Sequence, residues 1–241
     1  MVRLFILLLS LAVATPTRSL EKSDSRHWEE YQASYTLSWR GLPVGTSHHS
    51  VHKIGNSQFI AKVIAKPFLA FLPFKSSEES HFRVSSLQIQ SDYYEYDTQE
   101  KSKHLQGKIY FDWGKKTIHH VFANHLNQSQ SLPENALDKM TLYFQLRQDL
   151  RQQKNVFHYT VIEPKRTKTV HLVLKGLETI QTPIGTFETV KLEYLSDDHQ
   201  KFTRIWLAKE LDYIIVKLQQ SKKGKVTAES TLKTLQHWNA S

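Results

Sequence analysis

Residues 176–194 read GLETIQTPIGTFETVKLEY and contain the turn that decides the fold class. Pro183 has the backbone angle required at the second position of a β-turn, and Gly185 can adopt the left-handed backbone that closes it. Apolar residues alternate with polar ones on both sides, with Leu177 before the turn and Leu192 after it. A phosphate-binding loop would need several glycines and a following helix N-terminus, and neither is present. This stretch is therefore predicted to form a β-hairpin with a bulge-type turn.

The same alternation runs through most of the chain. Five apolar residues between 31 and 39 share one parity and polar residues occupy the other, which indicates a half-buried strand. Turns with Gly and Asn at 41–45 and 55–56 separate the strands that follow. Further strands are expected at residues 46–54, 59–65, 80–90, 92–98, 104–111, 117–123, 155–163, 169–174, 187–195, 201–208, 213–220 and 226–235. Strands of this length with short turns predict an all-β, mainly antiparallel domain.

One segment departs from the alternation. Ser131 stands three residues before Glu134 with Pro133 between them, the arrangement of a capping box at a helix start. Apolar residues then recur at helical spacing, among them Tyr143 and Phe144. Residues 133–152 are therefore predicted to be one amphipathic helix, packed against a strongly curved sheet or open β-barrel. Tyr143 and Phe144 are expected to face the interior of that sheet.

The N-terminus has the layout of a secretory signal peptide, with Arg3 followed by an apolar run to Ala14. Cleavage is expected after Ala14 or Ser19, which leaves residues 20–241 as a single β-rich domain. The run is shorter than the ~20 residues that cross a bilayer, and no second segment is apolar enough. No transmembrane helix is therefore expected after signal removal.

Cysteine is absent from the sequence. The chain thus lacks disulfides, a thiol nucleophile and a cysteine for lipidation, so we expect a periplasmic protein that is not a lipoprotein. The formal net charge of +9 favours anionic partners such as lipid head groups or acidic glycans. The alternative is that the lysines only solvate strand faces. Nucleic acid is not an expected partner, because export argues against it and no Lys/Arg cluster follows a groove.

Candidate catalytic and metal-binding groups are few. His48 and His52 would lie on a strand ~13 Å apart, too far to share one ion. The stretch 197–199, Asp-Asp-His, could supply an acid and a base but falls where a polar turn is expected. No Gly-x-Ser-x-Gly elbow occurs. We predict no catalytic residues, no metal site and no cofactor.

An apolar stretch with two prolines, KPFLAFLPFK at 66–75, is the most unusual segment. It is expected to be a loop or short helical turn over the core, because prolines argue against a central strand. The functional hypothesis is a flap at the mouth of a β-cup that contacts an acyl chain or a bilayer surface, with lysines that meet anionic head groups. The ligand-binding candidates are Lys66, Phe68, Leu69, Phe71, Leu72, Phe74, Lys75, Tyr143 and Phe144.

Four stretches, at 176–187, 35–45, 137–147 and 204–217, resemble a family of exported bacterial proteins known as domain-of-unknown-function family 3108. The resemblance implies an envelope location and a β-rich fold. It implies no reaction and no catalytic residue.

These observations favour a periplasmic, non-enzymatic envelope protein that binds a lipid or another apolar or anionic envelope ligand in a β-cup. The alternative is an envelope assembly or structural factor that binds a protein partner. A hydrolase of envelope polymers is the third hypothesis.

Overall fold

The structure is a computed structural model that describes residues 30–69, 72, 74–85, 88–100, 102–122, 127–195 and 200–238. The expected signal peptide at 1–19, Phe71 and the stretch 197–199 lie outside these residues. Within them, no helix is long and apolar enough to span a bilayer.

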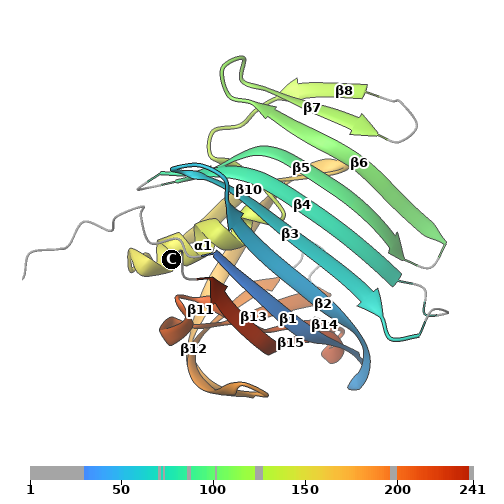
Figure 1. Ribbon diagram of the computed structural model, residues 1–241, viewed down its shortest axis with the longest axis vertical. Coiled ribbons are helices and arrows are strands. Elements are labelled where there is room, and N and C mark those ends of the chain that lie inside the picture. Colours follow the sequence, from blue (N-terminus) through green and yellow to red (C-terminus); the bar gives the residue numbers. More distant parts are fainter. Residues whose placement is uncertain are drawn as a thin grey trace, which may run out of the picture.

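The described residues form one strongly curved sheet of 15 strands with a single α-helix (Figure 1). The strands are β1 (Glu30–Trp39), β2 (Leu42–Lys53), β3 (Gln58–Pro67), β4 (Phe74–Val84), β5 (Ile89–Glu100), β6 (Lys103–Asp112), β7 (Thr117–Phe122), β8 (Asn127–Ser131), β9 (Ala136–Asp138), β10 (Phe157–Glu163), β11 (Arg166–Thr182), β12 (Gly185–Leu195), β13 (Lys201–Ala208), β14 (Ile214–Lys222) and β15 (Lys225–Trp238). Their order in the sheet is β8-β7-β6-β5-β4-β3-β2-β1-β15-β14-β13-β12-β11-β10-β9. Every neighbouring pair is antiparallel except β9 and β10. The predicted fold class, a mainly antiparallel curved sheet with one helix, is confirmed.

The opening hairpin is confirmed as well. Thr182 at the end of β11 pairs with Gly185 at the start of β12, so Pro183 and Ile184 form a two-residue turn. Gly185 has φ +148°, a backbone conformation that favours glycine. The register shift lies between Leu174 and Gly176 rather than at the turn, so the predicted bulge is displaced along β11.

The helix begins later than predicted. Helix α1 spans Thr141–Arg151, and the segment that was expected to start it forms β9, parallel to β10. The N-cap position is Met140, which makes no side-chain cap bond, but reciprocal hydrogen bonds like those of a capping box precede it. The Asp138 Oδ1 atom accepts from the Thr141 amide at 2.9 Å, and the Thr141 hydroxyl accepts from the Asp138 amide at 2.8 Å. The expected box at Ser131 and Glu134 is therefore wrong, because that stretch leads into β9.

Several strand boundaries also differ from the prediction, and β11, expected at 169–174, spans Arg166–Thr182. The expected strand 80–90 ends at Val84, and β5 starts at Ile89, because the chain turns between them. The short strands β8 and β9 were not predicted.

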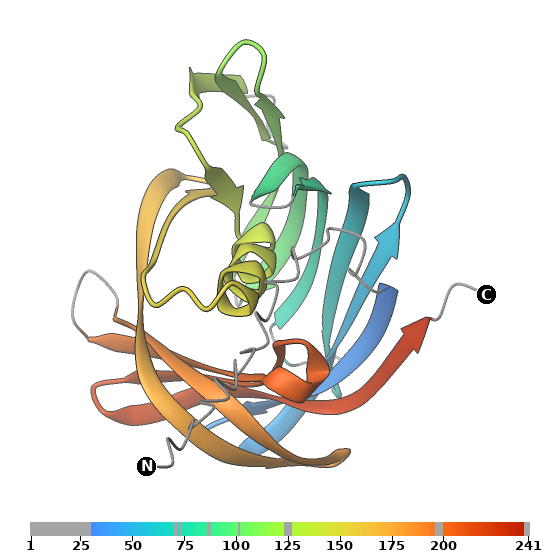
Figure 2. The same cartoon turned by 90° about the vertical axis from the view of Figure 1, so that its left-hand side faces the viewer.

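Side chains rather than a backbone ladder join β9, at one end of the sheet, to β4 and β5. Strand β9 contacts β5, with which it shares no ladder. The Ser80 hydroxyl of β4 donates to Asp138 Oδ2 at 2.6 Å, and the Asp138 amide donates to the Ser91 hydroxyl of β5 at 3.1 Å. We call Ser80, Ser91, Asp138 and Thr141 the buried seam. Helix α1 lies inside the curve at the end of the sheet that faces the viewer in Figure 2.

Candidate functional site

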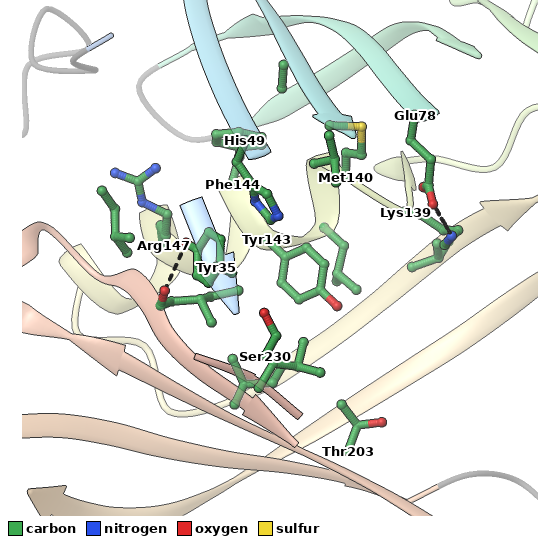
Figure 3. Close-up of a pocket in the computed structure, with 18 of the residues that line it drawn as sticks. Tyr35, His49, Glu78, Lys139, Met140, Tyr143, Phe144, Arg147, Thr203 and Ser230 are labelled. Atoms are coloured by element: carbon green, nitrogen blue, oxygen red, sulfur yellow. Dashed lines mark hydrogen bonds and ion pairs between the residues drawn. The ribbon is translucent and has the colours of Figure 1, made fainter. Parts of the chain in front are cut away.

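A cavity of about 420 Å³ lies between the N-terminal half of α1 and the concave face of the sheet (Figure 3). Its walls come from β1–β4, α1 and β10–β15, so strands distant in sequence meet around one space. Apolar and aromatic residues outnumber polar ones in these walls. The volume falls in the lower part of the ~300–1,000 Å³ range typical of small-molecule sites.

The inner end of the cavity is mostly apolar, with the Arg147 guanidinium beside the Tyr31 and Phe144 rings. Tyr31, Tyr35 and Val51 contribute from β1 and β2, Phe144 from α1 and Ile214 from β14, and all five are buried. Alternation places these strand residues on the concave face. The Tyr35 hydroxyl donates to the Ile215 carbonyl at 3.0 Å, which satisfies its polar atom and leaves the ring to line the wall.

The outer end of the cavity, which we call the mouth, is polar. Lys168, Tyr194, Thr203 and Gln220 line it, and each stands within three residues of one end of its strand. Tyr194 pairs with Thr203, and Thr203 pairs with Gln220, so three of them form a row across β12, β13 and β14. The four residues therefore mark one opening at one end of the sheet.

Lys168 and Tyr194 leave hydrogen-bonding capacity at the mouth. The Lys168 ammonium lies 4.4 Å from the centre of the Tyr194 ring, a cation–π contact. It has no ion pair with any residue that the structure describes. The Tyr194 hydroxyl is buried without a hydrogen-bond partner among those residues. A buried hydroxyl of this kind costs about 1–3 kcal/mol unless a ligand or water meets it.

A second polar group borders the cavity where α1 begins. The Lys139 ammonium lies 3.0 Å from Glu78 Oε1, and the Tyr94 hydroxyl donates to Glu78 Oε2 at 2.5 Å. Burial acts to raise the pKa of Glu78, but Lys139 and the hydrogen bonds to this carboxylate together hold the pKa below its ordinary value. Glu78 is therefore an ionised, paired carboxylate near neutral pH and not a proton donor.

Tyr143 and His49 present neutral polar atoms to the cavity. The Tyr143 hydroxyl points into the open space (Figure 3), and burial together with Glu78 raises the pKa of Tyr143 to about 12. Burial lowers the pKa of His49 to about 4, with Glu78 acting in the opposite direction. His49 is therefore neutral near pH 7; its Nε2 atom lies 2.9 Å from the Ser47 hydroxyl and its ring packs on Tyr35.

Helix α1 is held in place by charged contacts, and the one at Arg147 also borders the cavity. Arg147 donates to Asp212 Oδ2 at 2.7 Å and Arg151 forms a second ion pair with the same carboxylate. The Asp149 carboxylate accepts from the Tyr159 hydroxyl of β10 at 2.8 Å. These contacts fix the helix as one wall of the cavity.

The predicted ligand-binding residues fall into two groups. Tyr143 and Phe144 line the cavity. Six of the others do not line it: Lys66, Phe68, Leu69, Leu72, Phe74 and Lys75. Phe71 lies outside the described residues.

The second group lies at the connection between β3 and β4, at the same end of the sheet as the mouth. Phe68 and Leu69 are 54% and 53% exposed. The Phe74 ring lies against Gly45, where a Cβ atom would come within 2.8 Å of it. Lys66 and Lys75 are exposed on the flanking strands.

Several cavity residues were not predicted, above all Lys168, Tyr194 and Thr203. Alternation alone shows that they share a parity with buried neighbours such as Val170, Leu192 and Ile205. It does not show that they surround one space with the helix, since that depends on the register of β11 to β14.

The histidines that were weighed as metal ligands lie on β2, as expected of a strand. His48 is exposed, and His52 lies 3.8 Å from a Glu30 oxygen. Within the described part of the chain, no group of three or more His, Cys, Asp or Glu side chains could hold a metal ion.

Comparison with known proteins places the chain in a family. The family model described as "Protein of unknown function (DUF3108)" matches residues 34–231, so the chain belongs to this family. This confirms the resemblance in the four stretches between 35 and 217. No curated protein matches the chain significantly.

Solved structures match the chain at low sequence identity. The crystal structure of a beta-barrel-like protein of domain of unknown function DUF1849 from Brucella abortus matches with a TM-score of 0.58 at 8% identity, over 88% of this chain and 98% of that chain. A provisionally assigned lipoprotein from Parabacteroides distasonis matches with a TM-score of 0.41 at 10% identity, over 86% and 95% of the two chains. A provisionally assigned exported protein with a YmcC-like fold from Bacteroides fragilis matches with a TM-score of 0.34 at 10% identity, over 86% and 96%. The first of these supports a beta-barrel-like fold.

Proposed function

We propose that this DUF3108 protein is an exported, non-enzymatic protein of the cell envelope that holds the acyl chain of an amphiphile in the cavity beside α1. The observation that carries the proposal is the cavity itself, about 420 Å³ with an apolar inner end and a polar mouth. This polarity matches a ligand with an apolar chain and a polar head. Periplasmic location is part of the proposal and rests on the signal-peptide pattern at 1–19.

The polar groups of the cavity also indicate which head group the ligand carries. Lys168 offers a positive charge, and the hydroxyls of Tyr143 and Tyr194 can donate hydrogen bonds. A group with negative charge and several acceptor oxygens, such as a carboxylate or a phosphate, suits this set of donors. The cavity volume favours one acyl chain over several, because it lies low in the range for ligand sites.

The chemistry of the walls argues for binding rather than reaction. Glu78 is paired with Lys139, and His49 makes a hydrogen bond to Ser47. Each group thus has a structural partner, and Ser47 is buried and does not line the cavity, so the Ser47–His49 pair does not present a nucleophile to a bound ligand.

The test is binding of a fluorescent fatty acid, with a variant that fills the cavity. Ser230 of β15 lines the cavity and its hydroxyl points inward (Figure 3), so Ser230→Phe places a ring in the space that the chain would occupy. We expect the affinity for the probe to fall by about tenfold or more, since overpacking typically costs about 1–3 kcal/mol. Thr231→Phe, on the opposite face of the same strand, is the matched control and should bind as the unaltered protein does.

Two outcomes would contradict the proposal. One is a protein that does not take up the probe at all, which would favour an assembly factor that binds a protein partner. The other is equal binding by Ser230→Phe and Thr231→Phe, which would locate the probe elsewhere. Circular dichroism of both variants shows whether they are folded.

A further inference from the structure

The mouth of the cavity lies at one end of the strands, together with a set of connections that we call the basic rim. Because antiparallel neighbours alternate in direction, the β1–β2, β3–β4, β5–β6, β10–β11, β12–β13 and β14–β15 connections all lie at this end. The first three follow one another along the right-hand side of Figure 1. Helix α1 occupies the opposite end, which faces the viewer in Figure 2.

Exposed lysines without an ion pair gather on the basic rim. They flank the β3–β4, β10–β11 and β14–β15 connections: Lys66, Lys75, Lys165, Lys222, Lys223 and Lys225. None of them forms an ion pair with a residue that the structure describes, whereas lysines on the strands, such as Lys62 and Lys191, pair with carboxylates. The rim thus holds uncompensated positive charge.

Other residues of these connections add to the same charge. Arg40, Lys201 and Arg166 are exposed on the rim, and Arg166 pairs with Glu163 at 3.1 Å. Glu100 is a further acid. The residues of these connections that the structure does not describe contribute one lysine and two aspartates to the sequence. The sum of the charges on the basic rim therefore stays strongly positive.

Some lysines of the basic rim lie opposite each other, which destabilises the folded chain when no anion is bound. Lys222 at the end of β14 pairs in register with Lys225 of β15. Like charges directly opposite each other across a sheet are destabilising. An external anion that meets these side chains would relieve the repulsion.

Large apolar side chains are exposed beside the lysines. Trp39 and Leu42, at the β1–β2 turn, are 53% and 69% exposed, and Phe68 and Leu69 are 54% and 53% exposed. The two connections are neighbours, because the Phe68 amide donates to the Val44 carbonyl at 2.9 Å. Apolar side chains next to unpaired lysines match the boundary between head groups and acyl chains in a bilayer.

We propose that the basic rim docks this protein onto an anionic lipid bilayer, with the mouth of the cavity toward the membrane. The lysines contact lipid phosphates, and Trp39, Leu42, Phe68 and Leu69 enter the interface. This orientation lets an acyl chain pass between bilayer and cavity without crossing bulk water. The docking extends the proposed function but has its own evidence in the charge and exposure of the rim.

The test is sedimentation of the full chain with vesicles of equal parts phosphatidylglycerol and phosphatidylcholine, compared with phosphatidylcholine alone. The rim variant is K222Q/K223Q/K225Q. The matched control is K115Q/K116Q/K209Q, which removes the same charge at the opposite end, from the β6–β7 turn and the segment after β13. A lysine near an anionic surface strengthens binding about fivefold, so the rim variant should bind about 100-fold more weakly and the control should bind nearly as the unaltered protein does.

A second pair of variants tests the apolar contact. F68S/L69S removes two exposed apolar side chains from the rim, and I54S/L177S removes two from elsewhere on the sheet, where Ile54 and Leu177 are 55% and 67% exposed. We expect weaker vesicle binding for the first pair alone, and a difference that persists at high salt, since apolar contact is not screened.

Equal losses in the two lysine variants, or no preference of the unaltered protein for anionic vesicles, would overturn the docking proposal. So would unchanged binding by F68S/L69S. The affinity for the fluorescent fatty acid, measured without vesicles, tests the proposed function independently of membrane docking. If vesicle binding follows the rim but the probe is not bound, the cavity proposal fails and the docking proposal stands; the reverse result overturns docking alone.

Discussion

Asp138→Ala should destabilise the protein more than most single substitutions, because Asp138 joins α1 to the sheet at the buried seam. Its carboxylate is fully buried and accepts three hydrogen bonds. Asp138 Oδ1 accepts from the Met140 and Thr141 amides at 2.7 and 2.9 Å, and Oδ2 accepts from the Ser80 hydroxyl at 2.6 Å. All three donors belong to buried residues.

The size of the effect follows from these three bonds. Each buried donor left without an acceptor costs about 1–3 kcal/mol, so the alanine variant loses roughly 3–9 kcal/mol before any compensation. Some of this is regained, because burial raises the pKa of Asp138 in spite of its hydrogen bonds, and the buried charge is thus itself unfavourable. We expect a net loss of about 3 kcal/mol in the free energy of unfolding. Asp138→Asn keeps the acceptor for both amides and should lose only about 1 kcal/mol.

Urea unfolding at neutral pH measures both values from the midpoint, provided that the slope is unchanged. Asp97→Ala is the control: its side chain is 47% exposed, and its loss should stay within about 0.5 kcal/mol. The reasoning is refuted if Asp138→Ala unfolds at the same urea concentration as the unaltered protein. Equal losses in Asp138→Asn and Asp138→Ala would show that the charge, and not the hydrogen bonds to the two amides, matters at the seam.

Three further predictions concern a cavity residue, the helix and the pairing of β2 with β3. The pKa of His49 is about 4 against an ordinary 6.5, so below pH 6.5 the unfolded chain takes up a proton that the folded chain does not. Between pH 7 and pH 5 this residue should therefore lower the free energy of unfolding by about 2 kcal/mol. His49→Gln, compared with the unaltered protein by urea midpoints at both pH values, should lack that part of the loss. Asp212→Asn removes the carboxylate charge that pairs with the buried Arg147 guanidinium. This should cost about 2 kcal/mol, less than the loss of a fully buried pair, because Asp212 is 40% exposed. Faster amide exchange in α1 would show the effect, and unchanged exchange would contradict it. Gly45→Ala puts a Cβ atom 2.3 Å from the Lys66 carbonyl oxygen and should cost about 1–3 kcal/mol in a thermal melt, whereas Gly114→Ala meets nothing closer than 3.5 Å and should melt as the unaltered protein does.

The sheet could be predicted from the sequence because its signal is local. One face of each strand is buried, so residues such as Tyr31, Ala33 and Tyr35 repeat with a period of two, and glycine or asparagine marks the turns. The start of the helix could not be predicted this way. Ser131 and Glu134 satisfy a local capping rule, but residues 136–138 pair with β10. Asp138, which is also bonded to Ser80 and Ser91, accepts from the first amide of α1 instead.

Only some of the residues that line the cavity could be predicted from the sequence, for the same physical reason. Tyr143 and Phe144 lie on one helix, where spacing alone shows which side faces inward. Lys168, Tyr194 and Thr203 come from three strands, and their meeting depends on register and on the curvature of the whole sheet.

Native mass spectrometry of the protein, purified gently from a bacterial periplasm and then extracted under denaturing conditions, tests the central claim most directly. The account predicts a bound mass that matches an amphiphile with an acyl chain and an acidic head, retained by Thr231→Phe and absent from Ser230→Phe. An apo mass for the unaltered protein, or a bound mass that survives in Ser230→Phe, would contradict it.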